Sequence, residues 1–183
     1  MFLRKSNCRQ LHDTEKIRLT ISSSRGEANI CNVGLYYAEN ISGQSAEFRL
    51  SDVKPDKWSI VGLEPSAGKM IDGDKDSCWK TDSLTPIVVN LGHNHEISGF
   101  VYTPPVSDDL SGTIFKYDFY VSSDGITWEQ CVANGEFSNI MHNPIPYYVR
   151  FGKKIKASYI KLVPLREINS QNKTSVGEIG ILL

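Results

Sequence analysis

The stretch that most restricts the fold is the segment 115–132, FKYDFYVSSDGITWEQCV. Apolar or aromatic residues occupy every second position from Phe115 to Val121. This alternation indicates a strand with one buried face and one wetter face. Asp124 and Gly125 then supply a tight turn, so the segment predicts a β-hairpin.

Further short β-rich runs recur along the chain, and turn-forming residues separate them. No segment longer than a turn has helical periodicity. Short strands at this spacing predict an all-β fold, either a β-sandwich or a barrel. With 183 residues, 40% of them apolar, the chain is long enough for one good core. The predicted strands are 16–21, 30–37, 86–92, 97–105, 147–152, 159–165 and 177–183.

Charge and targeting signals exclude some classes of function. A net charge of −1 gives no electrostatic reason to expect a nucleic acid or an anionic membrane as partner. No apolar run approaches the ~20 residues of a membrane span. The first residues, MFLRKSNCRQLHD, lack the apolar region of a signal peptide, so the chain taken literally is expected to stay in the cytoplasm unless it is a fragment.

The four cysteines are far apart and have no CxxC spacing, which argues against a zinc site. Spacing leaves three possible disulfide pairings open, and free thiols are the favoured state. The histidines are scattered among predicted loops. The pair in GHNHE, at 92–96, is either a metal-ligating arrangement on one strand face or part of a turn, and the turn is favoured.

Residues 68–81, GKMIDGDKDSCWKT, hold three aspartates two positions apart, Asp72, Asp74 and Asp76. The repulsion among these carboxylates is most simply relieved by a hard cation, and oxygen ligands favour Ca²⁺. The loop is not an EF-hand, because serines stand at the sixth and twelfth positions counted from Asp72. A solvated acidic turn is the remaining alternative.

The two ends of the chain resemble each other. IRLT followed by NVGLY, within residues 17–36, resembles IKLV followed by EIGIL, within residues 160–182. This match predicts that residues 1–40 are the remnant hairpin of a preceding β-sandwich plus a linker, and that residues 41–183 form the main domain. Coincidence between short β-rich strings is the alternative.

With these motifs in view, the region from about Phe48 to Leu183 resembles a discoidin, or coagulation-factor type C, domain, also known as the family 32 carbohydrate-binding module. The matching strings are WSIVG, MIDGDKDSCWKT, VVNLG, SGFVYTP, YDFYVSSDGITWEQ, YIKL and GEIGIL. The resemblance implies a jelly-roll-like, galactose-binding-domain-like β-sandwich with a calcium loop. The three tryptophans match framework positions of the family and are therefore expected in the core.

The N-terminal segment KIRLTISSSRGEANICNVGLYYAE resembles the end of the β-sandwich that precedes such modules in bacterial family 29 α-L-fucosidases. The resemblance implies that the parent chain is an extracellular or periplasmic glycoside hydrolase with α-L-fucosidase-like activity. The chain itself shows no convincing pair of acid and base residues, so we expect a non-catalytic module. We also expect this module to be a monomer.

The resemblance also implies a set of calcium ligands that joins the acidic loop to the last strand. Glu178, in the apolar stretch VGEIGILL, would be costly to bury without a partner, which agrees with such a site. The implied ligands are the carboxylates of Asp72 and Glu178, a hydroxyl or carbonyl of Thr81, and the backbone carbonyls of Lys69, Asp74 and Gly177.

The sugar site is where the sequence departs from the family. Galactose-binding members use a histidine beside the calcium loop, an arginine after a YTP-type strand end and a nearby asparagine, and this chain has Lys80, Pro105 and Ser111 there. Proline removes the fork of fixed donors that an arginine offers to a diol. We expect the ligand-binding residues to be Lys80, Tyr102 as a stacking surface, Asp108, Asp109, Asn169, Asn172 and Lys173.

The leading functional hypothesis is therefore a non-catalytic carbohydrate-binding module for glycans, with terminal galactose- or fucose-type sugars as candidate ligands. Adhesion to phospholipid or protein is the second hypothesis, ranked lower because the loops are polar and the chain is near neutral. A structural spacer whose sugar site has decayed is the third.

Overall fold

The computed structural model describes residues 57–74, 76–107 and 109–183. The chain divides into two units, Met1–Glu47 and Phe48–Leu183, and the described residues belong to the second. The remnant hairpin predicted in residues 1–40 lies outside the described residues and stays a prediction, together with the strands predicted there.

The described residues form short and long β-strands and one 3-10 helix, and the all-β prediction is confirmed. No helix in this described part is long and apolar enough to cross a membrane. In chain order the elements are β1 (Ser59–Val61), η2 (Pro65–Ile71), β2 (Trp79–Thr81), β3 (Ile87–Thr103), β4 (Ile114–Ser122), β5 (Glu129–Glu136), β6 (Tyr147–Glu167), β7 (Thr174–Val176) and β8 (Glu178–Leu182).

The predicted hairpin is present as β4 and β5, which pair antiparallel on either side of the turn at Asp124 and Gly125. Tyr117, Phe119 and Val121 are buried, as the alternation predicts. The runs predicted as separate strands at 86–92 and 97–105 are one continuous strand, β3, and those at 147–152 and 159–165 are one continuous strand, β6.

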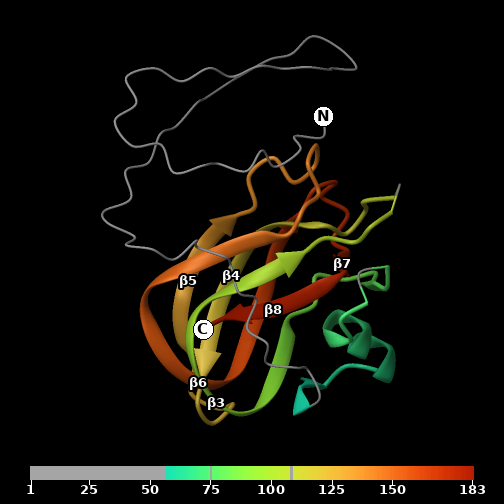
Figure 1. The fold of residues 1–183 in the computed structure, drawn as a ribbon. Coiled ribbons are helices and arrows are strands. Elements are labelled where there is room, and N and C mark those ends of the chain that lie inside the picture. The colour runs from blue at the N-terminus through green and yellow to red at the C-terminus, as the bar shows by residue number, and fades with distance from the viewer. Residues whose placement is uncertain (1–56, 75, 108) are drawn as a thin grey trace, which may run out of the picture. The chain divides into compact units, whose positions relative to one another are not determined.

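The two longest strands, β3 and β6, are bent and contribute to both layers of the sandwich (Figure 1). The main sheet has the order β1-β3-β6-β4-β5, and β8 also pairs with β3. The first half of β3 pairs with β1 and with the second half of β6, whereas its last residues pair with β8 and the start of β6. Register shifts between Asn90 and His95 and between Ile97 and Gly99 accompany this change of partners.

Gly99 lies at the second register shift, where β3 and β6 approach closely. A Cβ atom at this position would stand 2.1 Å from the carbonyl oxygen of Val149, so no other residue fits without moving the backbone. This glycine therefore marks the point from which β3 pairs with both β6 and β8.

Aromatic rings fill the space between the layers. Phe100 of β3 stacks on Phe119 of β4 with ring centroids 3.9 Å apart, and Phe137 stacks on both Tyr102 and Tyr117. These five rings are fully or almost fully buried. Because fully burying an aromatic side chain is worth about 1.5–3 kcal/mol, this cluster is a main source of stability.

The tryptophans do not all lie in the core. Trp79 is buried and Trp58 packs against the core, as expected. The prediction for Trp128 is wrong: its ring is only half-buried, and the ammonium group of Lys161 lies 4.2 Å from the ring centroid. A cation–π contact on the outside of the sheet holds this ring instead of core packing.

Candidate functional site

The acidic loop follows η2 and is organised by its own side chains. Asp72 accepts a hydrogen bond from the backbone N–H of Asp74 at 2.8 Å, and Asp74 accepts one from the N–H of Asp76 at 3.0 Å. The hydroxyl of Ser77 is within 3.1 Å of both the Asp72 carboxylate and the carbonyl oxygen of Lys69. Local hydrogen bonds of this kind explain how alternating acids form a compact turn.

Glu178, the first residue of β8, reaches this loop from the far end of the sequence. Its carboxylate accepts a hydrogen bond from the backbone N–H of Gly73 at 2.8 Å and is also hydrogen-bonded to Asp72. Partial burial, with the neighbouring Asp72 and Asp74, raises the pKa of Glu178 to about 7. Burial alone would raise the pKa of Asp72 too, but hydrogen bonds from Asp74, Glu178 and Ser77 lower it.

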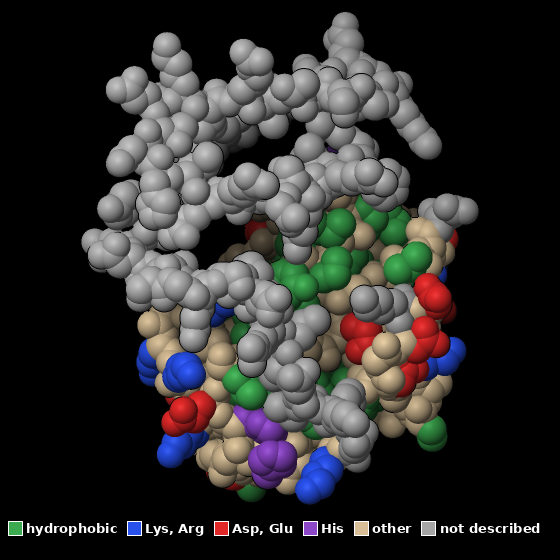
Figure 2. Space-filling view, viewed as in Figure 1, with side chains coloured by type: hydrophobic (Ala, Val, Ile, Leu, Met, Phe, Trp, Pro, Cys, Tyr) green, Lys and Arg blue, Asp and Glu red, His purple; other side chains and the backbone are tan. Residues whose placement is uncertain are grey.

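The ligand atoms gathered at the acidic loop fit a hard cation. Lys69, Asp72 and Glu178 offer oxygen atoms to this site, and the carboxyl groups of Asp72 and Glu178 are hydrogen-bonded to each other. Within the described ranges no three His, Cys, Asp or Glu side chains form a metal cluster, so a calcium ion here would also need carbonyl ligands. The ligand roles predicted for Lys69, Asp72 and Glu178, and those for Asp74, Thr81 and Gly177, stay predictions. In Figure 2, acidic side chains gather on the right of the visible face, the side on which Figure 1 draws η2.

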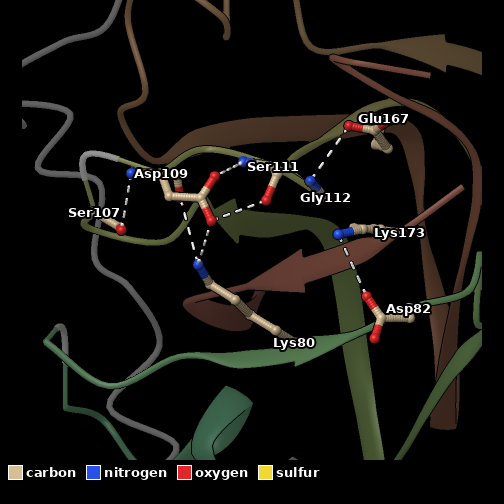
Figure 3. Close-up of polar contacts among 8 residues, drawn as sticks. All are labelled: Lys80, Asp82, Ser107, Asp109, Ser111, Gly112, Glu167 and Lys173. Atoms are coloured by element: carbon tan, nitrogen blue, oxygen red, sulfur yellow. Dashed lines mark hydrogen bonds and ion pairs between the residues drawn. The ribbon is translucent and has the colours of Figure 1, made fainter. Parts of the chain in front are cut away.

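A second polar region lies where the β2–β7 ribbon meets the loop 104–112 (Figure 3). Lys80 of β2 forms an ion pair with Asp109 of the loop, with Nζ 3.6 Å from Oδ2, and also donates to the Asp109 carbonyl at 3.4 Å. The Asp109 carboxylate accepts from the N–H and the hydroxyl of Ser111, both at 3.0 Å. These bonds from Ser111, and then the charge of Lys80, lower the pKa of Asp109.

The same ribbon carries a second ion pair. β2 and β7 pair antiparallel with Thr81 opposite Thr174, and just beyond this pair Lys173 lies 3.5 Å from Asp82. Asn169 and Asn172 are exposed on the neighbouring loop. The structure therefore brings together Lys80 and Asp109, and it places Lys173 on the adjoining edge, whereas Asp108 lies outside the described residues. Asp82 was not among the residues predicted from the sequence.

The prediction that Tyr102 stacks on a sugar is wrong. This side chain has no exposed surface: its hydroxyl donates to the carbonyl of Ser175 at 3.0 Å and accepts from the N–H of Ile114 at 3.1 Å. Burial raises the pKa of Tyr102 well above its usual range. A tyrosine is buried fully where its hydroxyl finds backbone partners, and both partners here come from segments distant in sequence.

Pro105, at the position where the family has an arginine, is also buried. It therefore presents no side chain to a ligand, and the exposed polar groups in this loop belong to the residues after it. One of the residues that organises these loops was not anticipated from the sequence. Glu167, at the end of β6, is 1% exposed and accepts hydrogen bonds from backbone N–H groups on both loops.

Residues 51–179 match the family model described as F5/8 type C domain, and the chain belongs to that family. In the solved structures, the chain resembles the family 32 carbohydrate-binding module of Clostridium perfringens NanJ in complex with galactose. The identity is 25% and the TM-score 0.59, over 70% of this chain and 96% of that one. The predicted discoidin-type sandwich is thus confirmed.

Larger enzymes contain similar domains. A putative α-L-fucosidase from Bacteroides ovatus is 30% identical with a TM-score of 0.55, over 80% of this chain and 22% of the fucosidase chain. Galactose oxidase from Gibberella zeae is 27% identical over 143 residues, which are 72% of this chain and 20% of the oxidase. The chain therefore spans about a fifth of the length of the curated relative that it matches.

Proposed function

We propose that the chain is a non-catalytic carbohydrate-binding module whose ligand contacts come from Lys80, Asp109 and the neighbouring loop 168–173. The Lys80–Asp109 pair carries this proposal, because it joins two distant segments and leaves both side chains substantially exposed, at 40% and 67%. Lysine donates hydrogen bonds and aspartate accepts them, so the pair can bind adjacent hydroxyls of a sugar ring. The family membership and the galactose complex of the similar Clostridium module support this reading.

The ligands best suited to this site are uncharged sugars of the galactose or fucose type. Lys80 and Lys173 are each already paired with an aspartate, so neither offers an uncompensated positive charge to an acidic glycan. Exposed polar contacts contribute only about 0.5–1.5 kcal/mol each. Because Tyr102 and Pro105 are buried and offer no contact, we expect dissociation constants of about 0.1–1 mM.

The proposal extends to a structural calcium ion at the acidic loop. Asp72, Glu178 and the Lys69 carbonyl would hold it, and the ion would supply positive charge between two carboxylates that are otherwise in contact. Its effect would be to fasten the loop after η2 to β8. The parent protein is proposed to be an extracellular or periplasmic glycoside hydrolase, with an α-L-fucosidase favoured by the likeness to the Bacteroides enzyme.

Titration calorimetry with galactose, fucose, N-acetyllactosamine and a sialylated glycan tests the ligand class. We expect at least one neutral sugar to bind, and the sialylated glycan to bind no better. Lys80→Ala and Asp109→Ala should each weaken binding about tenfold, since each removes hydrogen bonds to a charged group. Lys153→Ala is a matched control, because Lys153 pairs with Glu129 on β5, away from these loops. Equal losses in all three variants, or strong binding unaffected by Asp109→Ala, would contradict the assignment of the site.

One observation favours adhesion as a second candidate function. Val106, on the same loop as Asp109, is 70% exposed, and an exposed apolar tip is the feature by which a loop enters a lipid surface. Co-sedimentation with anionic liposomes separates this function from glycan binding. Binding to liposomes but to no sugar would favour adhesion, and binding to neither would favour a structural spacer.

A further inference from the structure

We propose that Glu167 is a positioning residue for ligand binding: its buried carboxylate holds the loop 104–112 and the loop 168–173 at a fixed separation. This role rests on the proposed glycan-binding function, because those loops carry the proposed contacts. Glu167 itself is 1% exposed and therefore does not touch a ligand.

The Glu167 carboxylate accepts hydrogen bonds from backbone N–H groups of both loops at once. Oε2 accepts a hydrogen bond from the N–H of Gly112 at 3.3 Å and one from the N–H of Asn169 at 2.8 Å, and Oε1 accepts one from the N–H of Gln171. Figure 3 shows Glu167 above Gly112, which follows Ser111, a hydrogen-bond partner of the Asp109 carboxylate that pairs with Lys80. A single side chain thus connects segments more than fifty residues apart in sequence.

Gly112 is the point at which the connected segments meet. Its backbone has φ of +81°, and its carbonyl accepts a hydrogen bond from the N–H of Ser175 in β7 at 2.7 Å. A Cβ atom here would lie 3.0 Å from that same nitrogen. The next residue, Thr113, accepts from the N–H of Ile168 at 3.0 Å, so both loops and β7 are joined within two residues.

The chemistry of the side chain suits this task. An ionised carboxylate accepts hydrogen bonds at both oxygens and donates none, so three N–H groups can converge on it. Hydrogen bonds to a charged acceptor are about twice as strong as those between neutral groups. None of the ion pairs among the described residues includes Glu167, and its carboxylate accepts from these three backbone N–H groups. A glutamine would turn an NH₂ group toward at least one of the N–H donors.

The consequence for the surface follows from the order of the chain. Asp109 and Ser111 come just before Gly112, and Asn172 and Lys173 come just after the turn that Glu167 holds. Fixing the backbone at Gly112, Asn169 and Gln171 therefore fixes the distance between the acceptors on one loop and the donors on the other. A site that is held in its binding geometry loses less entropy when the ligand binds.

The test compares Glu167→Gln with Asp124→Asn by titration with the neutral sugar that binds the wild type best, well below the melting temperature. Asp124 is a matched control, since its carboxylate also accepts two backbone N–H groups, those of Ile126 and Thr127. It lies at the opposite end of β4 from the loop 104–112 (Figure 1). Glu167→Gln should weaken binding about tenfold, and Asp124→Asn should leave it unchanged.

Hydrogen exchange of the amides supplies a second readout that does not depend on ligand binding. In the wild type, the amides of Gly112, Asn169 and Gln171 should exchange slowly although Asn169 and Gln171 are exposed, and Glu167→Gln should speed all three. Fast exchange in the wild type, or unchanged affinity in a folded Glu167→Gln protein, would overturn the role of Glu167. A wild type that binds no sugar would overturn the proposed function instead, and the exchange rates would still decide whether Glu167 holds the loops.

Discussion

Two acid-rich regions of this domain differ in the partners that surround their carboxylates. In the acidic loop, Asp72 and Glu178 meet each other directly, and the pKa of Glu178 is raised to about 7. In the ligand loops, Asp109 is paired with Lys80 and Ser111, and its pKa is lowered. The difference shows that a carboxylate's partners, and not its presence in a loop, determine the direction in which its pKa shifts.

The largest expected effect comes from removing calcium, which should act on the acidic loop alone. A chelator should lower the melting temperature of the wild type by several degrees, because an ion that binds only the native state stabilises it by mass action. Asp72→Ala and Glu178→Ala should abolish the response to added calcium. Asp109→Ala should keep it, and thermal denaturation measures all four proteins. A wild type whose melting temperature is insensitive to chelator would contradict the prediction that the acidic loop holds a calcium ion.

A second prediction concerns the support beneath the ligand loops. Tyr102→Phe should reduce the free energy of unfolding by about 1–3 kcal/mol, because the Ser175 carbonyl and the Ile114 N–H would lose a buried partner. Tyr120→Phe removes a hydroxyl from a less buried ring and should cost less. Denaturant titration compares the two. If both substitutions had the same small effect, the hydroxyl of Tyr102 would not be joining β4 to β7.

The pH dependence of ligand binding should reflect the lowered pKa of Asp109. Because its hydrogen bonds favour the charged form, the carboxylate should stay ionised below the ordinary aspartate value near 3.8, and sugar affinity should not change between neutral pH and that value. The stability that its ionisation contributes is present above the unfolded-state pKa and is lost as pH falls through the lowered, folded-state pKa. Calorimetry at several pH values checks this, with Asp109→Asn as the control that should show no such titration. An affinity that declines already around pH 5 or 6 would contradict the assignment.

The smallest effect is expected from Lys173→Ala. Its ion pair with Asp82 is exposed on both sides, and pairs of this kind contribute about 0–1 kcal/mol. We therefore expect an unchanged melting temperature and a modest loss of sugar affinity, smaller than that of Lys80→Ala. A loss greater than that of Lys80→Ala would move the centre of the site from the loop 104–112 to the loop 168–173.

The elements that sequence analysis predicted well are those defined by local pattern. The alternation from Phe115 to Val121 and the turn at Asp124 predicted β4 and its turn into β5, because each depends on residues close together in the chain. The convergence of Glu178 on the acidic loop followed from family resemblance together with the high cost of burying an acid in an apolar strand.

The errors concern side chains whose surroundings come from distant segments. Tyr102 has an aromatic ring of the kind that can stack on a sugar, but the ring is buried and its hydroxyl is bonded to the backbone of Ser175 and Ile114. Trp128 matches a framework position, yet Lys161 covers it on the outer face. Glu167 gave no signal at all, because a polar residue at a strand end is usually solvated, and only the fold shows the three N–H groups around it.

The bent strand β3 has a mechanical consequence for a domain that is joined to other parts of a longer protein. β3 pairs with β1, the first strand of the described domain, and with β8, the last, through separate stretches of its length. Tension applied at either flank would therefore enter the same central strand, whose hydrogen bonds run across the strand direction. The β2–β7 ribbon belongs to a separate sheet and would be spared most of that force.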